Sequence, residues 1–214
     1  MRKLKLQVQM SVDGFISGPN GEMDWMVWDW DNELKQYVEE ITESVDCIVL
    51  GRKLAQGFIP HWAANPELEG AVKINSTKKV VFTKTLDKSD PAVLNWENTD
   101  LANGDLADEI IKLKNQKGSD IIAYGGATFV SALIKLGLID EYHLFINPTA
   151  IGSGMTIFKE LKTYLNLTLV KSKSFQEEMR LSAWGKRMKL LFSQRSSTRL
   201  STTIKSITDW MNRI

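Results

Sequence analysis

The sequence predicts an α/β fold with parallel strands at its centre, and two kinds of pattern carry this prediction. Short apolar runs at 47–50, 79–83 and 120–124 have the length and composition of buried strands. Residues 105–117 and 128–136 instead repeat apolar side chains every three or four positions, as an amphipathic helix does. Short strands that alternate with helices are typical of a parallel sheet with helices packed on it.

The beginning of the chain predicts a strand, a loop and a helix. Residues 4–12 alternate polar and apolar side chains, which is the period of a strand. Residues 14–21 contain three glycines and a proline and are expected to form a loop, which an acidic, Trp-rich segment at 24–31 follows. A helix is expected over about 32–44, because its apolar residues share one face: Leu34, Tyr37, Val38 and Ile41.

The second half of the chain supplies the remaining elements. The helix at 105–117 is expected to stop at Gly118. An apolar run at 141–146 predicts a strand, 148–154 a loop, and the alternation over 163–173 a late strand. In sheets of this kind ligands bind beyond the carboxyl ends of the strands, so the turns after the strands are the first place to look for function.

Composition places the chain among soluble, single-domain proteins. It has 214 residues, of which 43% are hydrophobic and 25% charged. The single cysteine, Cys47, lies in an apolar run, which favours a buried, inert thiol and excludes a disulfide within the chain. No apolar stretch is long enough to span a membrane, and the alternating start does not resemble a secretory signal, so we expect a cytoplasmic protein.

Charge is distributed unevenly along the chain. Residues 171–214 carry ten Lys and Arg against three acidic residues, whereas residues 1–170 have an excess of six acidic residues. This split predicts that the end of the chain differs in kind from the rest.

Two glycines after the predicted strand 120–124 are the strongest sign of a binding site. Gly125 and Gly126 stand between that strand and a helix, where the backbone can approach an anion closely at the positive end of the helix. A tight turn that binds nothing is the alternative. The hydroxyl of Thr128 is placed either to cap the helix or to contact a phosphate.

Two further strand ends repeat this arrangement of glycine, hydroxyl and cation. Gly51, Arg52 and Lys53 follow one strand, and Thr83 and Lys84 follow another. Each set alone is equally consistent with solvated surface charges. Together the three turns favour a ligand with several phosphates, such as a dinucleotide.

Side chains that could serve catalysis stand near the start of the chain. Asp13, in the Ser11-Val12-Asp13-Gly14 segment, either accepts a hydrogen bond from a substrate or forms an ordinary Asp-Gly turn. Trp25 either forms a wall for a planar ring or packs in the core. Asp31 and Glu33 open the first helix, where acids are favoured by the helix dipole in any case.

Hydrolytic and metal chemistry have little support in the sequence. His61 and His143 are the only histidines, no His/Cys cluster is present, and no G-x-S-x-G motif occurs. We therefore predict no metal site, and we expect reactivity to come from an organic cofactor.

Several of these motifs together resemble those of a known protein family. The chain resembles the dihydrofolate-reductase-like fold, and more closely the reductase domain of bacterial bifunctional riboflavin-biosynthesis deaminase–reductases and its stand-alone relatives. The resemblance covers residues 1 to about 175 and rests on five motifs: Ser11-x-Asp13-Gly14-Phe15-Ile16, Gly51-Arg52, Gly125-Gly126, Leu138-Ile139-Asp140-Glu141, and Pro148-x-x-x-Gly152-x-Gly154-x-x-x-Phe158. It implies a three-layer sandwich, a central, mostly parallel sheet with helices on both faces.

The resemblance also implies an NADPH-dependent reductase and assigns roles to residues. The adenosine phosphates would contact Gly51, Arg52, Thr83 and Lys84. The pyrophosphate near the nicotinamide would contact Gly125, Gly126, Ala127 and Thr128. The substrate would be bordered by Ser11, Asp13, Pro148 and Gly152, with catalytic roles for Asp13, Trp25, Asp31 or Glu33, and residues 16–25 would lie over the nicotinamide as a lid.

The implied reaction is that of 5-amino-6-(5-phosphoribosylamino)uracil reductase, a hydride transfer from NADPH to a small substrate in riboflavin biosynthesis. Dihydrofolate reduction and a nucleotide-binding module without turnover are the alternatives. A homodimer is expected from the resemblance, no membrane partner is expected, and a nucleic-acid partner is disfavoured.

Residues 176–214 depart from the family pattern and are predicted to be an atypical basic tail. We expect that the last 35–40 residues are not the ancestral terminus. A frameshifted reading, a genuine basic extension and a nucleic-acid contact are the three explanations.

Overall fold

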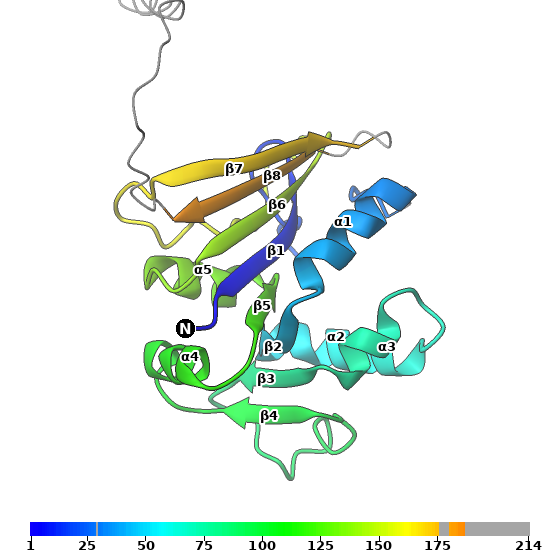
Figure 1. The fold of residues 1–214 in the computed structure, drawn as a ribbon, viewed down its shortest axis with the longest axis vertical. Coiled ribbons are helices and arrows are strands. Elements are labelled where there is room, and N and C mark those ends of the chain that lie inside the picture. Colours follow the sequence, from blue (N-terminus) through cyan, green and yellow to red (C-terminus); the bar gives the residue numbers. More distant parts are fainter. Residues whose placement is uncertain (29, 176–179, 187–214) are drawn as a thin grey trace, which may run out of the picture.

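The structure, a computed structural model, describes residues 1–28, 30–175 and 180–186 (Figure 1). Its strands are β1 Leu4–Ser11, β2 Val45–Gly51, β3 Lys78–Phe82, β4 Thr99–Ala102, β5 Asp120–Tyr124, β6 Glu141–Asn147, β7 Leu167–Ser174 and β8 Arg180–Lys186. Its helices are α1 Asn32–Thr42, α2 Arg52–Ala64, α3 Ala71–Ser76, α4 Leu106–Asn115 and α5 Ala127–Lys135.

All these strands form one sheet in the order β4-β3-β2-β5-β1-β6-β8-β7. The strands from β4 to β6 are parallel to their neighbours, whereas β8 runs antiparallel to both β6 and β7. The predicted α/β fold with a mostly parallel sheet is therefore confirmed.

Helices cover both faces of the sheet, which makes three layers. Figure 1 shows α4 and α5 on one face and α1, α2 and α3 on the other. The first face is the larger core, in which Leu6 of β1 packs with Ile110 of α4 and Val130 of α5. On the second face, α2 and α1 cover separate clusters, one around Leu50 and one around Phe145.

Two helices begin with a side-chain cap. Asp31 accepts a hydrogen bond from the Leu34 N–H at 2.7 Å and so caps α1. Asp105 caps α4 by accepting from Ala107 N–H at 2.8 Å and Asp108 N–H at 3.2 Å. Such caps satisfy N–H groups that the first helical turn leaves unpaired. By contrast, α2 and α5 start at Gly51 and Gly126 without any side-chain cap.

Four elements were not predicted from the sequence: α2, α3, β4 and β8. In α2, Gly57 and Pro60 interrupt the pattern of a helix, although Pro60 is accommodated inside it. The helix α3 has six residues, and β4 has four with an exposed aspartate, so neither gives a clear period. The late strand predicted over 163–173 is β7, which begins only at Leu167.

The strand β8 lies inside the segment that the sequence assigned to the tail. It pairs with β6 from Glu141↔Gly185 to Ile146↔Arg180, and with β7 on its other side. The sheet thus extends beyond residue 175, the expected domain boundary, to at least Lys186. The other residues of the predicted tail, 176–179 and 187–214, lie outside the described residues. Among the helices of the described part of the chain, none has the length and apolar character that crossing a membrane requires.

Candidate active site

The three turns predicted to bind phosphate follow neighbouring strands. Thr83 follows β3, Gly51 is the last residue of β2, and Gly125 follows β5. Because these strands are adjacent and parallel, all three residues lie at the same edge of the sheet. We call this the C-terminal edge, and the opposite one the N-terminal edge. Ligands of open α/β sheets bind at the C-terminal edge.

The first turns of α2 and α5 are in contact at this edge. A Cβ atom added to Gly51 would lie 2.7 Å from Cβ of Phe129 in α5, so only glycine permits this approach. On the other side, Leu54 of α2 lies 3.8 Å from the Cβ positions of both Gly125 and Gly126. Two helix N-termini without side-chain caps therefore stand side by side, and their free N–H groups and partial positive charges suit an anion.

Backbone conformation, rather than lack of space, requires glycine in the turn before α5. Gly125 has φ 40° and Gly126 has φ 80°. A Cβ at either position would meet nothing closer than 3.8 Å, so the cost of a side chain is the left-handed backbone itself.

Cations surround the two helix starts without carboxylate partners. Arg52 is half-buried and Lys53 exposed, and neither forms an ion pair with a described residue. Lys159, which the sequence analysis did not single out, is exposed with its Nζ 3.5 Å from Thr128 Oγ1. No sequence signal identifies Lys159, because it lies 31 positions from Thr128.

Two other residues predicted to bind phosphate contact their own backbone. Thr83 Oγ1 accepts hydrogen bonds from the Thr85 and Leu86 N–H groups at 3.1 and 3.0 Å. Lys84 Nζ donates to the carbonyls of Asn103 and Gly104 at 2.5 and 2.7 Å. In this structure both side chains hold the turn after β3 in place.

The two segments predicted to border the substrate are joined by Asp13. Its carboxylate accepts hydrogen bonds from the Gly152 N–H at 2.8 Å and from the Ile151 N–H at 3.2 Å. The Ser11 hydroxyl and the Gly152 N–H hold the pKa of the Asp13 carboxyl below its usual value. Ser11 is buried and its Oγ accepts from the Phe15 N–H at 2.9 Å, whereas Pro148 is exposed.

Backbone hydrogen bonds extend this junction along the predicted lid. Val12 N–H donates to Thr149 O at 3.0 Å, Ile16 N–H to Met155 O at 2.8 Å, and Met155 N–H to Ser17 O at 2.9 Å. The start of the lid is thus attached to the loop that follows β6.

The other catalytic candidates lie between β1 and α1 or on α1. Trp25 is half-buried, and its indole N–H is enclosed without a hydrogen-bond partner among the described residues. Asp31 is the cap of α1, and Glu33 forms an ion pair with Lys173 of β7 at 2.8 Å. Both acids therefore have structural roles.

A polar face on β1 was missed by the sequence analysis. One face of β1 is buried apolar core, formed by Leu4, Leu6, Val8 and Met10, while the opposite face carries Lys5, Gln7, Gln9 and Ser11. A strand in the middle of a parallel sheet is normally apolar on both faces. Gln7 and Gln9 nevertheless remain partly exposed, and Gln7 Oε1 is buried without a partner among the described residues. The alternation of polar and apolar residues over 4–12 could have indicated this polar face, but only with the knowledge that β1 lies in the middle of the sheet.

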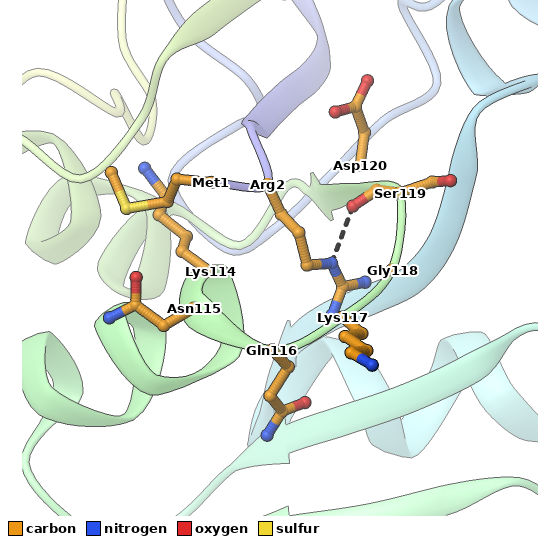
Figure 2. A pocket seen from close by; sticks show the side chains of 9 residues that line it. All are labelled: Met1, Arg2, Lys114, Asn115, Gln116, Lys117, Gly118, Ser119 and Asp120. Carbon is orange, nitrogen blue, oxygen red and sulfur yellow. Dashed lines mark hydrogen bonds between the residues drawn. The ribbon is translucent and has the colours of Figure 1, made fainter.

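A pocket of about 370 Å³ lies at the N-terminal edge, and Figure 2 shows its lining. Two of its cationic side chains are already paired, because Arg2 binds the Asp46 carboxylate and the Ser119 carbonyl, and Lys114 binds Asp140 and the Leu138 carbonyl. Lys117, which also lines the pocket, is exposed and forms no ion pair with a described residue. This pocket therefore has fewer unpaired cations than the C-terminal edge, where Arg52, Lys53 and Lys159 lack carboxylate partners among the described residues.

Comparison with known proteins agrees with this geometry. The family model described as the RibD C-terminal domain matches residues 2–181. The chain belongs to this family. The match includes the first two residues of β8, so the family pattern also continues past residue 175.

Two curated relatives in Bacillus subtilis (strain 168) are uncharacterized proteins. YyaP is 34% identical over 179 residues, which cover 81% of this chain and 89% of YyaP, and YwjB is 27% identical over 180 residues, covering 84% and 96%.

Solved structures share the fold at lower identity. A putative riboflavin biosynthesis protein from Shewanella sp. PV-4 is 23% identical with a TM-score of 0.66, and covers 88% of this chain and 100% of its own. A pyrimidine reductase-like protein from Corynebacterium diphtheriae is 15% identical with a TM-score of 0.59, covering 87% and 92%. This member of the RibD C-terminal domain family thus has a reductase-like fold.

Proposed function

We propose that the chain is an NADPH-dependent reductase that acts on 5-amino-6-(5-phosphoribosylamino)uracil or a closely related pyrimidine. The observation that carries this proposal is the contact between the first turns of α2 and α5 at the C-terminal edge. Two uncapped helix starts, glycines with positive φ and unpaired cations together suit a ligand with several phosphates. Membership of a reductase-like family makes NADPH the fitting ligand of that kind.

The residues present fit the parts of NADPH. Gly125, Gly126 and the N–H groups of Ala127 and Thr128 would hold the pyrophosphate, assisted by Lys159. Arg52 would hold the 2′-phosphate through charge-assisted hydrogen bonds, with Gly51 beside it. NADPH would supply the hydride.

The protein would orient the substrate and exclude water. The junction of Asp13 with Gly152 would fix the two loops that border the substrate, and Trp25 would cover it from the loop before α1. Ser11 and Pro148 lie at the ends of β1 and β6, on either side of that junction.

Cofactor preference tests the proposal most directly. Arg52→Ala should weaken NADPH binding about tenfold or more and NADH binding far less, because a charge-assisted pair to the 2′-phosphate is lost. Lys112→Ala is the matched control, because Lys112 is an exposed residue of α4 on the opposite face of the sheet. This variant should change the affinity for neither NADPH nor NADH. Dissociation constants from fluorescence titration give the answer, and equal weakening of both cofactors by Arg52→Ala contradicts the proposal.

Oxidation of NADPH over a substrate panel separates this function from its alternatives. The panel contains the ribosylamino-pyrimidine, dihydrofolate and simple imines. Turnover of the pyrimidine supports the proposal, and turnover of dihydrofolate alone favours a folate reductase. Binding of NADPH without oxidation favours a nucleotide-binding module. The structural roles of Asp31 and Glu33 make folate reduction the weaker alternative, since that reaction needs a carboxylate that faces the pterin ring.

A further inference from the structure

Asn147, the last residue of β6, has a fully buried side chain that joins two other segments. Its Oδ1 accepts a hydrogen bond from the Val27 N–H at 2.8 Å, in the loop that carries Trp25. Its Nδ2 donates to Gln9 Oε1 at 3.1 Å, on the polar face of β1. A buried polar side chain that is satisfied on both sides is held in one orientation.

The direction of these bonds follows from the backbone. The Val27 N–H can only donate, so the Asn147 atom that faces it must be the oxygen. The Asn147 amide nitrogen must then face Gln9, and the Gln9 atom that meets it must be an acceptor. Gln9 Nε2 is therefore turned away from Asn147, and it makes no hydrogen bond to a described residue.

Gln9 lies at a place where a substrate could meet it. Gln7 pairs in register with Tyr124, the last residue of β5, so Gln9 lies farther along β1, toward the turn of Gly125 and Gly126. Gln7 stands two residues before Gln9 on the same face and, at the Oε1 atom, carries a buried acceptor without a partner. Gln9 thus offers an amide donor next to the proposed cofactor turn, whereas the Gln7 Oε1 atom is enclosed by the protein.

We propose that Asn147 is a positioning residue that sets the hydrogen-bond polarity of the polar face. In this arrangement Gln9 donates to a carbonyl oxygen of the substrate ring. The inference rests on the proposed function, because it assumes that the substrate lies beside the cofactor turn. The inference predicts selectivity for a ring that carries a carbonyl opposite Gln9, because an amino group at that position would face the Gln9 amide with a second donor.

Two ring probes test this selectivity without turnover. The probes are 6-aminouracil and 6-aminocytosine, which differ by the exchange of the C4 carbonyl for an amino group and by the accompanying loss of the hydrogen on N3. Their affinities are measured by calorimetry in the presence of NADP⁺. The unaltered protein should bind 6-aminouracil about tenfold more tightly or better, as expected when one donor–acceptor pair is lost.

Two variants should reverse this preference. In Asn147→Asp the carboxylate has no donor, so Gln9 turns its Nε2 toward residue 147 and presents its oxygen to the ring. Gln9→Glu also presents only oxygens, but it leaves Asn147 in place and alters a partly exposed side chain, so it serves if Asn147→Asp fails to fold. Gln36→Glu, on the exposed surface of α1, is the matched control and should keep the original ratio.

The ratio of the two affinities is the decisive readout, because a purely structural role of Asn147 would weaken both probes alike. If the unaltered protein prefers 6-aminouracil and both variants keep that preference, the inference fails while the proposed function stands. If the unaltered protein binds NADPH but neither ring, the pyrimidine substrate and the inference both fail.

Discussion

The two edges of the parallel sheet use lysine and arginine in opposite ways. At the N-terminal edge Lys5, Lys79 and Lys114 are buried and fully engaged. Lys5 Nζ binds Asp120 at 2.9 Å and the Ile41 carbonyl at 3.0 Å, and Lys79 Nζ binds three carbonyls at 2.8–3.0 Å. At the C-terminal edge, Arg52, Lys53 and Lys159 have no carboxylate partner among the described residues.

This difference follows the direction of the helices. The negative, C-terminal ends of α1 and α3 are met by Lys5 and Lys79, whose ammonium groups bind the last carbonyls. The positive, N-terminal ends of α2 and α5 have no side-chain cap. At the N-terminal edge the chain supplies the partners of these helix ends, whereas the C-terminal edge is complementary to an anion that the chain does not supply. Substitutions at the first edge should thus affect stability, and those at the second should affect binding.

The largest expected effect lies at the N-terminal edge. Lys114→Met should lower the free energy of unfolding by about 3 kcal/mol, because it removes the partner of Asp140 and of the Leu138 carbonyl. Urea denaturation measures the loss. Affinity for NADPH should not change under native conditions, and a large loss of affinity would contradict the separation of the two edges.

At the C-terminal edge the glycine turn should matter most. Gly126→Ala should weaken NADPH binding about tenfold or more, since a side chain at φ 80° strains the turn by about 1–3 kcal/mol. Gly137→Ala is its matched control. Gly137 also has a positive φ, 65°, and a new Cβ there would meet open space, but the residue follows α5 at the other edge of the sheet. It should lose similar stability in a thermal melt yet retain the affinity. Equal affinities of the two variants for NADPH would contradict a role of Gly126 in cofactor binding.

A smaller effect is expected from the cation beside Thr128. Lys159→Gln should weaken NADPH binding about two- to fivefold at low salt, because exposed charge pairs contribute about 0.2–1 kcal/mol. The difference should shrink at high ionic strength. Lys162→Gln, exposed three residues later, should behave like the unaltered protein. A salt-independent loss would show that Lys159 acts through packing instead.

A further expected effect concerns acid stability at the N-terminal edge. The pKa of Glu141 is held at about 2 by two neighbours, His143 and Lys3. His143 Nε2 lies 3.6 Å from Glu141 Oε2, and Lys3 Nζ lies 2.7 Å from Oε1. Only the Lys3 contact is within hydrogen-bonding distance. A lowered pKa stabilises the fold above the unfolded value near 4.5, and this stabilisation is lost as the pH falls toward 2. Glu141→Gln should therefore flatten the unfolding free energy between pH 4.5 and 2. Glu67→Gln, at an exposed site, should leave this slope intact.

The sequence predicted the elements whose pattern is local. The strand at 120–124 coincides with β5, because a run of apolar residues between turn residues is buried on both faces. The helix at 105–117 differs from α4 only at its ends, since Asp105 is the cap and not the first helical residue. The location of the three candidate turns at one edge likewise followed from strand–helix alternation, because parallel strands end at the same edge, whereas the order of the strands came only from the structure.

The features that were missed depend on long-range contacts. Asn147 lies 138 positions from Gln9 and 120 from Val27, so no local pattern indicates its two hydrogen bonds. The roles of Thr83 and Lys84 in their own turn could not be distinguished in the sequence from phosphate contacts, because both uses need a hydroxyl and a cation after a strand. The strand β8 was missed because charged and small residues dominate it, and its stability comes from pairing with β6 and β7.

The place of β8 has a consequence for how the chain is made. In the described sheet β7 is the outermost strand and joins the rest only through β8, although β7 comes first along the chain. A ribosome that has released residues up to 175 has therefore produced β7 before the partner that connects it to β6. The backbone of β6 remains open on that side until translation passes residue 186. Chains that stop early would expose an unpaired strand to other nascent chains, and chaperones that bind extended segments would have their longest opportunity there.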